Sequence, residues 1–141
     1  MRSHLKAIKQ AKSERLECVL ILEDDVSFVS DFKEKFNCVY SELPESWDML
    51  YLNGSPPYAV RKHSDNLNKV WRLSGAFAYV VNSTFYDTLI AELSKEEKPC
   101  DGHYMDLQPK SNCYISRDKL VKHLDGYSVR AEKMVVYPHL R

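Results

Sequence analysis

The chain has 141 residues, of which 44% are hydrophobic and 28% are charged, as expected for one globular domain and not for a disordered protein. Its 20 basic residues balance 20 acidic residues, so no overall field would attract nucleic acid or an anionic membrane. Hydrophobic runs are too short for a membrane span and the N-terminus lacks the apolar segment of a secretory signal, so we expect a single cytoplasmic domain over residues 1–141.

The first predicted elements are a helix and a buried strand. Ser3 can act as the N-cap of a helix in which Leu5, Ile8 and Ala11 recur on one face. The run CVLIL at 18–22 is continuously apolar, which is typical of a strand that is buried on both faces.

Two further helices follow from the spacing of apolar residues. Phe32, Phe36 and Val39 recur at helical intervals, and Pro44 ends that helix. Asn82 is suited to cap a third helix.

Strands and loops occupy the segments between these helices. Residues 55–68 are polar and contain proline, so we expect a long loop there. Residues 100–106, CDGHYMD, are expected to form a turn, because Asp-Gly is a favoured turn pair. The alternation of helices and strands predicts an α/β fold with a largely parallel sheet. Further strands are expected at 47–53, 69–73, 76–81, 112–116 and 133–137.

The four cysteines are widely spaced and form no C-x-x-C pair. Cys18 and Cys38 lie within apolar patterns, which indicates reduced thiols in the core and a cytoplasm-like compartment. A disulfide between Cys100 and Cys113 is the alternative.

Three adjacent carboxylates, Glu23, Asp24 and Asp25, follow the first strand directly. Open α/β sheets bind ligands at the carboxyl ends of their strands. Because side chains alternate along a strand, Glu23 and Asp25 should point one way and Asp24 the other, unless the backbone turns there. Converging carboxylates suit a hard divalent cation such as Mg²⁺ or Mn²⁺. The alternative is a solvated acidic loop in which one residue caps the next helix.

Five blocks of sequence, taken together and in order, resemble the family-25 glycosyltransferases. This family includes the lipooligosaccharide galactosyltransferases of bacteria and the collagen galactosyltransferases. The blocks are SHLKAIKQAK at 3–12, LILEDDVSFVSDF at 20–32, WDMLYLNG at 47–54, GAFAYVVN at 75–82 and PCDGHYMD at 99–106.

The resemblance implies a GT-A-like enzyme that transfers galactose or glucose, with inversion, from a nucleotide-sugar to a glycan or a protein-linked hydroxyl. The donor is expected to be UDP-linked. The acidic triplet then corresponds to the DxD-type motif, so Glu23, Asp24 and Asp25 would hold Mn²⁺ (or Mg²⁺) against the donor diphosphate. His139 would reach the metal from the last strand, as a late histidine does in several GT-A enzymes.

Inversion requires a base for the acceptor hydroxyl, and the family's later aspartate block places this role on Asp101. Such a base typically contributes about 10²–10⁴-fold to the rate. The alternative is that Asp101 only shapes an Asp-Gly turn. His103 would contact donor or metal, or else lie exposed in the same turn.

The donor site is expected to include residues from two of the blocks. Gly75 and Ala76 remove side-chain bulk where the chain would pass close to a sugar or diphosphate, and Tyr79 belongs to the same Gly-x-x-x-Tyr element. A tight connection between two strands explains the glycine equally well. Ser3 and His4 match the family's Ser-His pair near the donor, with a simple helix cap as the alternative for Ser3.

One part of the family pattern is not matched. Family members usually carry a nucleotide-binding β-α segment ahead of the Ser-His helix, whereas this sequence begins just before Ser3. The GT-A-like fold is therefore expected in a form truncated at the N-terminus, with an exposed sheet edge beside residues 18–22 and a homo-oligomer that covers it. A non-catalytic relative that binds a sugar-nucleotide or a partner is the alternative function.

Overall fold

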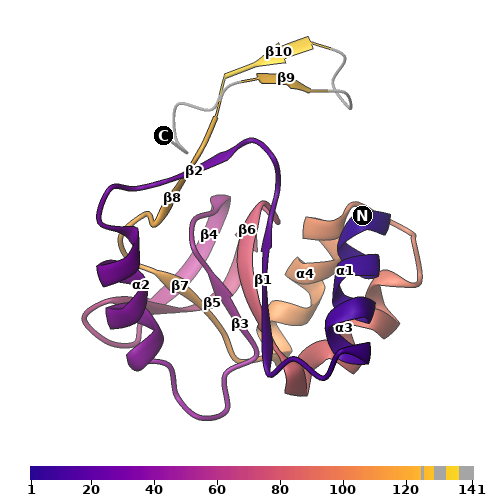
Figure 1. Cartoon of the computed structure of the whole chain (residues 1–141), viewed down its shortest axis with the longest axis horizontal. Coiled ribbons are helices and arrows are strands. Elements are labelled where there is room, and N and C mark those ends of the chain that lie inside the picture. The colour runs from indigo at the N-terminus through magenta and orange to yellow at the C-terminus, as the bar shows by residue number, and fades with distance from the viewer. Residues whose placement is uncertain (125, 129–132, 137–141) are drawn as a thin grey trace.

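The computed structural model describes residues 1–124, 126–128 and 133–136. A six-stranded sheet with the order β1-β6-β3-β7-β5-β4 lies at its centre, with helices on both faces (Figure 1). The strands of this sheet are β1 (Cys18–Leu22), β3 (Met49–Tyr51), β4 (Ser55–Lys62), β5 (Leu67–Ser74), β6 (Ala78–Asn82) and β7 (Cys113–Ser116). The helices are α1 (Arg2–Ser13), α2 (Phe32–Ser41), α3 (Tyr86–Leu93) and α4 (Cys100–Leu107), with 3-10 turns at Ser83–Phe85 and Gln108–Lys110. Two small antiparallel sheets pair β2 (Val26–Phe28) with β8 (Val121–His123), and β9 (Gly126–Ser128) with β10 (Lys133–Val135).

The α/β class with helices flanking the sheet is confirmed, but the sheet is mixed. Strands β3 and β7 run parallel, whereas the other four neighbouring pairs are antiparallel. Strand β6 runs antiparallel to both of its neighbours, and the segment expected to be a long loop instead supplies β4 and most of the β4–β5 hairpin. Strand β4 is an edge strand with register shifts between Ser55 and Val60, and such a position tolerates the prolines that suggested a loop.

The alternation of side chains across the sheet creates two apolar layers. Met49 and Tyr51 of β3 pack with α1, α3 and α4 on one face. Leu50 and the following Leu52 pack with Val39 of α2 on the other face. The strand is buried on both sides, which explains its continuous apolar sequence.

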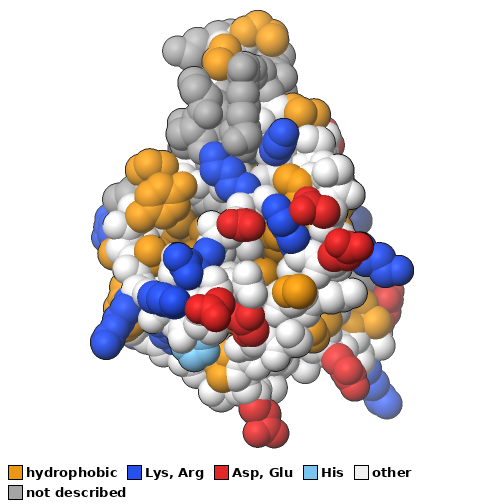
Figure 2. All heavy atoms as spheres, turned by 90° about the vertical axis from the view of Figure 1, so that its left-hand side faces the viewer, with side chains coloured by type: hydrophobic (Ala, Val, Ile, Leu, Met, Phe, Trp, Pro, Cys, Tyr) orange, Lys and Arg blue, Asp and Glu red, His pale blue; other side chains and the backbone are white. Residues whose placement is uncertain are grey.

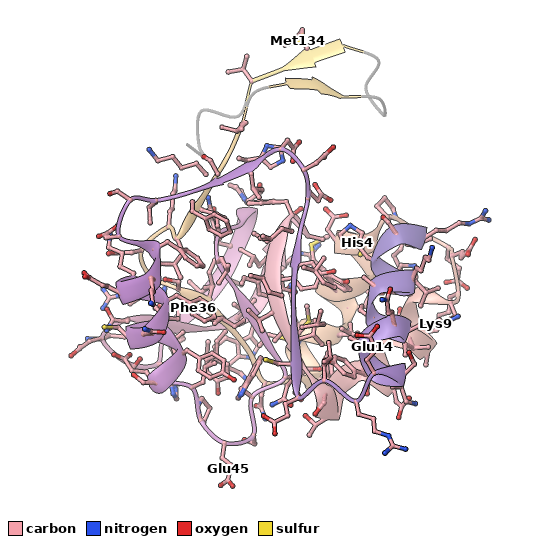
Figure 3. The ribbon with its side chains drawn as sticks, viewed as in Figure 1. His4, Lys9, Glu14, Phe36, Glu45 and Met134 are labelled. Atoms are coloured by element: carbon pink, nitrogen blue, oxygen red, sulfur yellow. The ribbon has the colours of Figure 1, made fainter. Side chains whose placement is uncertain are left out.

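Helix α1 turns a histidine toward the sheet. The helix begins at Arg2 with Met1 as its N-cap, so Ser3 lies inside the first turn and is not the cap. The buried face consists of His4, Ile8 and Ala11. Figure 3 shows His4 directed from α1 toward the strands.

Strand β1 is an edge strand and is not buried on both faces as its sequence suggested. Among the described strands it pairs only with β6. Ile21 is buried, but Leu20 and Leu22 remain 40% and 37% exposed on the opposite face of the sheet. No described strand therefore covers the free edge of β1.

The segment predicted to be a turn forms helix α4. His103 within it is fully buried, and its Nδ1 lies 2.9 Å from Glu92 Oε1 of α3. It therefore neither lies exposed nor lines the cleft described below.

All four cysteines are free, but their burial differs from the prediction. Cys38 is exposed and Cys18 is half-buried, whereas Cys100 and Cys113 are buried. Burial raises the pKa of the Cys100 thiol to about 11 and that of the Cys113 thiol to about 12.

The surface carries charges of both signs. Figure 2 shows acidic and basic side chains beside one another on the side of the molecule where α2 lies. Within the described ranges, the helices are too short or too polar for any of them to cross a bilayer.

Candidate functional site

A cleft of about 700 Å³ opens at the carboxyl end of β1. Its walls come from the start of α1, the end of β1, the connection from β5 to β6, and the start of α4. The fold thereby brings together segments from four of the five blocks noted in the sequence. The lining residues are Met1, His4, Glu23, Ser55, Ser74, Gly75, Ala76, Phe77, Lys98, Pro99, Cys100, Asp101 and His123.

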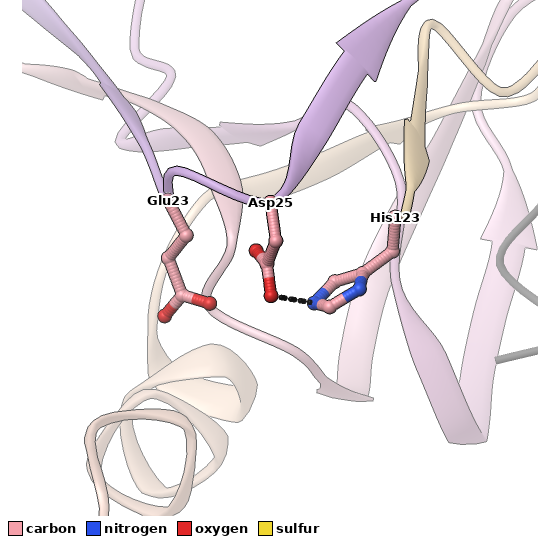
Figure 4. Close-up of side chains that lie close together, drawn as sticks. All are labelled: Glu23, Asp25 and His123. Carbon is pink, nitrogen blue, oxygen red and sulfur yellow. Dashed lines mark ion pairs between the residues drawn. The ribbon is translucent and has the colours of Figure 1, made fainter. Parts of the chain in front are cut away.

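Two carboxylates and one imidazole converge at this cleft. One possible ligand atom from each of Glu23, Asp25 and His123 lies within 4.8 Å of the other two (Figure 4). Antiparallel pairing of β2 with β8 places Val26 opposite His123, and Leu124 N donates to Asp25 O over 2.7 Å. The backbone thus fixes His123 beside the acidic turn.

Both ring nitrogens of His123 lie near acceptor oxygens. His123 Nδ1 lies 3.1 Å from the carbonyl oxygen of Leu124, and Nε2 lies 3.5 Å from Asp25 Oδ2. Asp25 Oδ1 is buried and has no hydrogen-bond partner within the part of the chain that the structure describes.

Asp24 does not join this cluster. It is exposed in the turn after β1 and lines a separate hollow of about 480 Å³ together with Ser3. Residues 24 and 25 lie in a turn, and the structure brings Glu23 and Asp25 together with His123. Asp24 is not part of this group, so its role as a metal ligand stays a prediction.

Asp101 lies in the first turn of α4 and faces the same cleft as Glu23. Its Oδ2 accepts a hydrogen bond from Ser74 Oγ at 2.8 Å, and its Oδ1 accepts one from Gly102 N at 3.0 Å. The carboxylate is thus held in one orientation across the cleft from β1. These contacts also suit a residue that only stabilises the start of α4.

Gly75 and Ala76 form part of the cleft wall between β5 and β6. Gly75 has a φ of +99°, a conformation that other residues rarely adopt. A Cβ atom there would lie 2.9 Å from Cε1 of Phe77 and 3.5 Å from Ser55 N. These contacts support the explanation of a tight connection between two strands, whereas the role of Gly75 beside a sugar or diphosphate stays a prediction.

The other residues predicted for the nucleotide-sugar site differ in how deeply they are buried. His4 lines the cleft, and its Nε2 is 3.4 Å from Glu23 Oε1. Tyr79 is fully buried behind it and does not line the cleft, because its position on β6 faces α1. Ser3 is exposed and borders only the second hollow.

Sequence reasoning missed His123 as a candidate ligand. His139, which was predicted instead, lies outside the described residues. A weak signal was present, since Val121 and His123 are both buried and alternate with exposed Lys122, as in a half-buried strand. Nothing in that local pattern indicates that β8 pairs with β2.

Comparison with known proteins gives a limited result. No protein-family profile matches the chain. A segment of 65 residues, 45% of the chain, is 38% identical to "Procollagen lysyl hydroxylase and glycosyltransferase" of Acanthamoeba polyphaga mimivirus. The match covers 7% of that protein, so the chain corresponds to a small part of its length. The chain is therefore similar to part of a protein named as a glycosyltransferase, whereas membership of family 25 stays a prediction.

Proposed function

We propose that this chain is a metal-dependent glycosyltransferase that moves a sugar from a nucleotide-sugar to a hydroxyl group. The observation that carries the proposal is one cleft in which Glu23 and His123 lie with Asp101. The match to the mimivirus protein supports the same reaction class.

The residues of the cluster fit a divalent cation. Two carboxylates and an imidazole supply three possible ligand atoms within 4.8 Å of one another, and Asp25 contributes a buried oxygen for which the described residues offer no hydrogen bond. Mg²⁺ strongly prefers oxygen ligands, so the imidazole favours Mn²⁺ over Mg²⁺. Glu23, Asp25 and His123 would hold this ion.

The charge of the cleft explains why a cation is required for a nucleotide-sugar. Glu23 and Asp101 both line it with carboxylates, and the ammonium of Lys98 is paired with Asp106. A diphosphate would be repelled by these carboxylates alone. When bound, a divalent cation supplies Lewis-acid stabilisation of the diphosphate leaving group.

Asp101 is the proposed general base. Ser74 and Gly102 orient its carboxylate while leaving further lone pairs on both oxygens, so it can accept a proton from an acceptor hydroxyl. Gly75 and Ala76 keep the intervening wall free of bulky side chains. The acceptor is proposed to be a glycan or a hydroxylated protein, and the transferred sugar galactose or glucose.

A binding and transfer assay tests this function. Unfolding is followed with MnCl₂ and UDP-galactose, UDP-glucose or other nucleotide-sugars, and a ligand at 100 times its Kd should stabilise the fold by about 2.7 kcal/mol. Release of UDP and transfer to glycan or hydroxylysine-peptide acceptors are then measured by mass spectrometry. Binding without transfer would indicate a non-catalytic relative, and absence of binding to every donor would contradict the proposal.

A further inference from the structure

A buried series of polar side chains leads from the cleft into the core. Glu23 Oε1 lies 3.4 Å from His4 Nε2, His4 Nδ1 lies 2.8 Å from the Tyr79 hydroxyl, and that hydroxyl lies 2.6 Å from the Tyr104 hydroxyl. His4, Tyr79 and Tyr104 are 7%, 0% and 1% exposed. We call these four residues the polar row. It joins α1, the turn after β1, β6 and α4, and so connects the cleft to the core.

The chemistry of the groups gives the polar row a direction. A carboxylate only accepts hydrogen bonds, so the ring proton of neutral His4 belongs on Nε2, which faces Glu23. His4 Nδ1 is then an acceptor, and the Tyr79 hydroxyl donates to it. The Tyr104 hydroxyl in turn donates to the Tyr79 oxygen. Each hydroxyl in the row thus has a defined donor role.

The environment keeps these hydroxyls protonated. Burial raises the pKa of Tyr79 and of Tyr104 well above the ordinary value for tyrosine. The rings also fix one another, since His4 stacks on Tyr79 with an interplanar angle of 9° and Tyr79 meets Tyr104 edge-on at 5.2 Å between centroids. The row is therefore rigid, and its two hydroxyl groups stay protonated and able to donate hydrogen bonds.

Core filling alone does not explain this arrangement. Histidine and two tyrosines bring polar atoms into an apolar layer where phenylalanine or leucine would avoid the cost of desolvation. The series also ends on Glu23, whose side chain is 41% exposed, whereas the His4 side chain beside it is 8% exposed. Groups that hold a ligating carboxylate are a general feature of metal sites.

We propose that His4, Tyr79 and Tyr104 are positioning residues, which hold Glu23 toward Asp25 and His123 and so set the affinity of the site for a divalent cation. This inference rests on the proposed function, because it assigns Glu23 as a metal ligand. Tyr79 acts through His4 and touches neither substrate nor ion.

Removal of one hydroxyl tests the proposal. Tyr79→Phe keeps the ring but removes the donor to His4, and Mn²⁺ affinity measured by calorimetry should fall by about 10- to 100-fold, as for other supporting groups of metal sites. Tyr51→Phe is the matched control, since Tyr51 is equally buried on the same sheet face and its hydroxyl bonds to Gln108 at 2.9 Å. The control should keep the wild-type affinity.

Two further measurements separate positioning from a loss of fold. His4→Gln can present an N–H near the position of Nε2 and should retain more Mn²⁺ affinity than His4→Leu. In ¹⁵N NMR spectra of the metal-free protein, neutral His4 should carry its proton on Nε2 in the wild type and lose this preference in Tyr79→Phe.

The outcomes distinguish this proposal from the proposed function. Wild-type Mn²⁺ binding that is unchanged in Tyr79→Phe, or reduced equally in Tyr51→Phe, overturns the positioning role alone. A proton on His4 Nδ1 in the wild type overturns the direction of the polar row and the role with it. Absence of Mn²⁺ binding by the wild type overturns the metal site itself.

Discussion

The three adjacent carboxylates at the end of β1 are divided between two sides of the chain. Glu23 and Asp25 face His123, whereas Asp24 faces the hollow beside α1. All three were expected as ligands from the sequence, with alternation as a reason for a split only if the backbone did not turn, and residues 24 and 25 do lie in a turn. The third ligand was not predictable in this way, because His123 reaches the cluster only through the pairing of β2 with β8.

Substitutions within this triplet should distinguish a metal ligand from a neighbouring carboxylate that does not bind the metal. Asp25→Ala removes the oxygen that is buried without a described partner, so most Mn²⁺ binding should be lost in calorimetric titration. Asp24→Ala should leave the affinity nearly unchanged, as should Asp31→Ala, whose carboxylate pairs with Lys35 at 3.2 Å. Equal Mn²⁺ affinity in the wild type and Asp25→Ala would refute the metal assignment.

Asp101→Asn tests the catalytic role at a single atom. The amide oxygen can still accept from Gly102 N, and the amide NH2 can donate to Ser74 Oγ in place of the bond that Oδ2 accepts, but the group cannot take up a proton. If Asp101 is the base, turnover should fall by about two to four orders of magnitude while Mn²⁺ and donor binding persist. A variant with nearly full turnover would show that Asp101 only stabilises the start of α4 and is not the base.

At the scale of elements, the sequence predicted those segments whose periodicity is strong. The aromatic spacing from Phe32 indicated α2, and Asn82 does accept from Thr84 N at 3.3 Å ahead of α3. Helix α4 was missed because its apolar residues show little helical periodicity and Asp-Gly favours turns. Strand β1 was expected to be buried on both faces because an apolar run alone does not distinguish a covered strand from a partly exposed one.

The connection between β5 and β6 requires glycine at position 75. Gly75→Ala would hold alanine at a φ of +99° against Phe77, and we expect a loss of about 1–3 kcal/mol in the free energy of unfolding. Gly102→Ala is the control, because it lies inside α4 and its Cβ would meet only the flexible side chain of Lys98, 3.1 Å away at Cδ. That variant should be neutral or slightly stabilised. Urea denaturation measures both, and equal effects would contradict this account.

The buried thiols of α4 and β7 predict a loss of stability at alkaline pH. Burial raises the pKa of Cys113 to about 12 and that of Cys100 to about 11, against about 8.5 for an exposed thiol. The folded state therefore keeps protons that the unfolded state releases. This contribution is fully present below pH of about 8.5 and declines as pH rises toward the folded pKa values, by up to roughly 1.4 kcal/mol per pH unit for each thiol.

Denaturation between pH 8 and 10 checks this expectation. Cys113→Ala should show a smaller decline of the unfolding free energy with pH than the wild type, even where it is less stable at every pH. Cys38→Ala should keep the wild-type slope, because Cys38 is exposed. Identical slopes in all three proteins would exclude the thiols as the cause.

At the scale of the whole molecule, the two edges of the sheet differ. Strand β4 carries Pro56, Arg61, Lys62 and register shifts, all of which discourage pairing with another chain. Strand β1 has no charged residue, no proline and no shift in its pairing with β6. One edge is thus protected against association, and the other, at β1, is open within the described part of the chain.

We expect the open edge to pair with a second copy of the chain. Antiparallel pairing of β1 with its own copy about a two-fold axis is self-complementary, and it would bring the exposed Leu20 and Leu22 of both copies together on one face. The formal net charge of zero gives no overall repulsion.

Light scattering at micromolar concentration should therefore give the mass of a dimer. Leu20→Lys should shift it to a monomer, whereas Val60→Lys on the protected edge, where Val60 is 39% exposed, should not. A wild-type protein that is monomeric at these concentrations would show that the edge at β1 remains uncovered in solution.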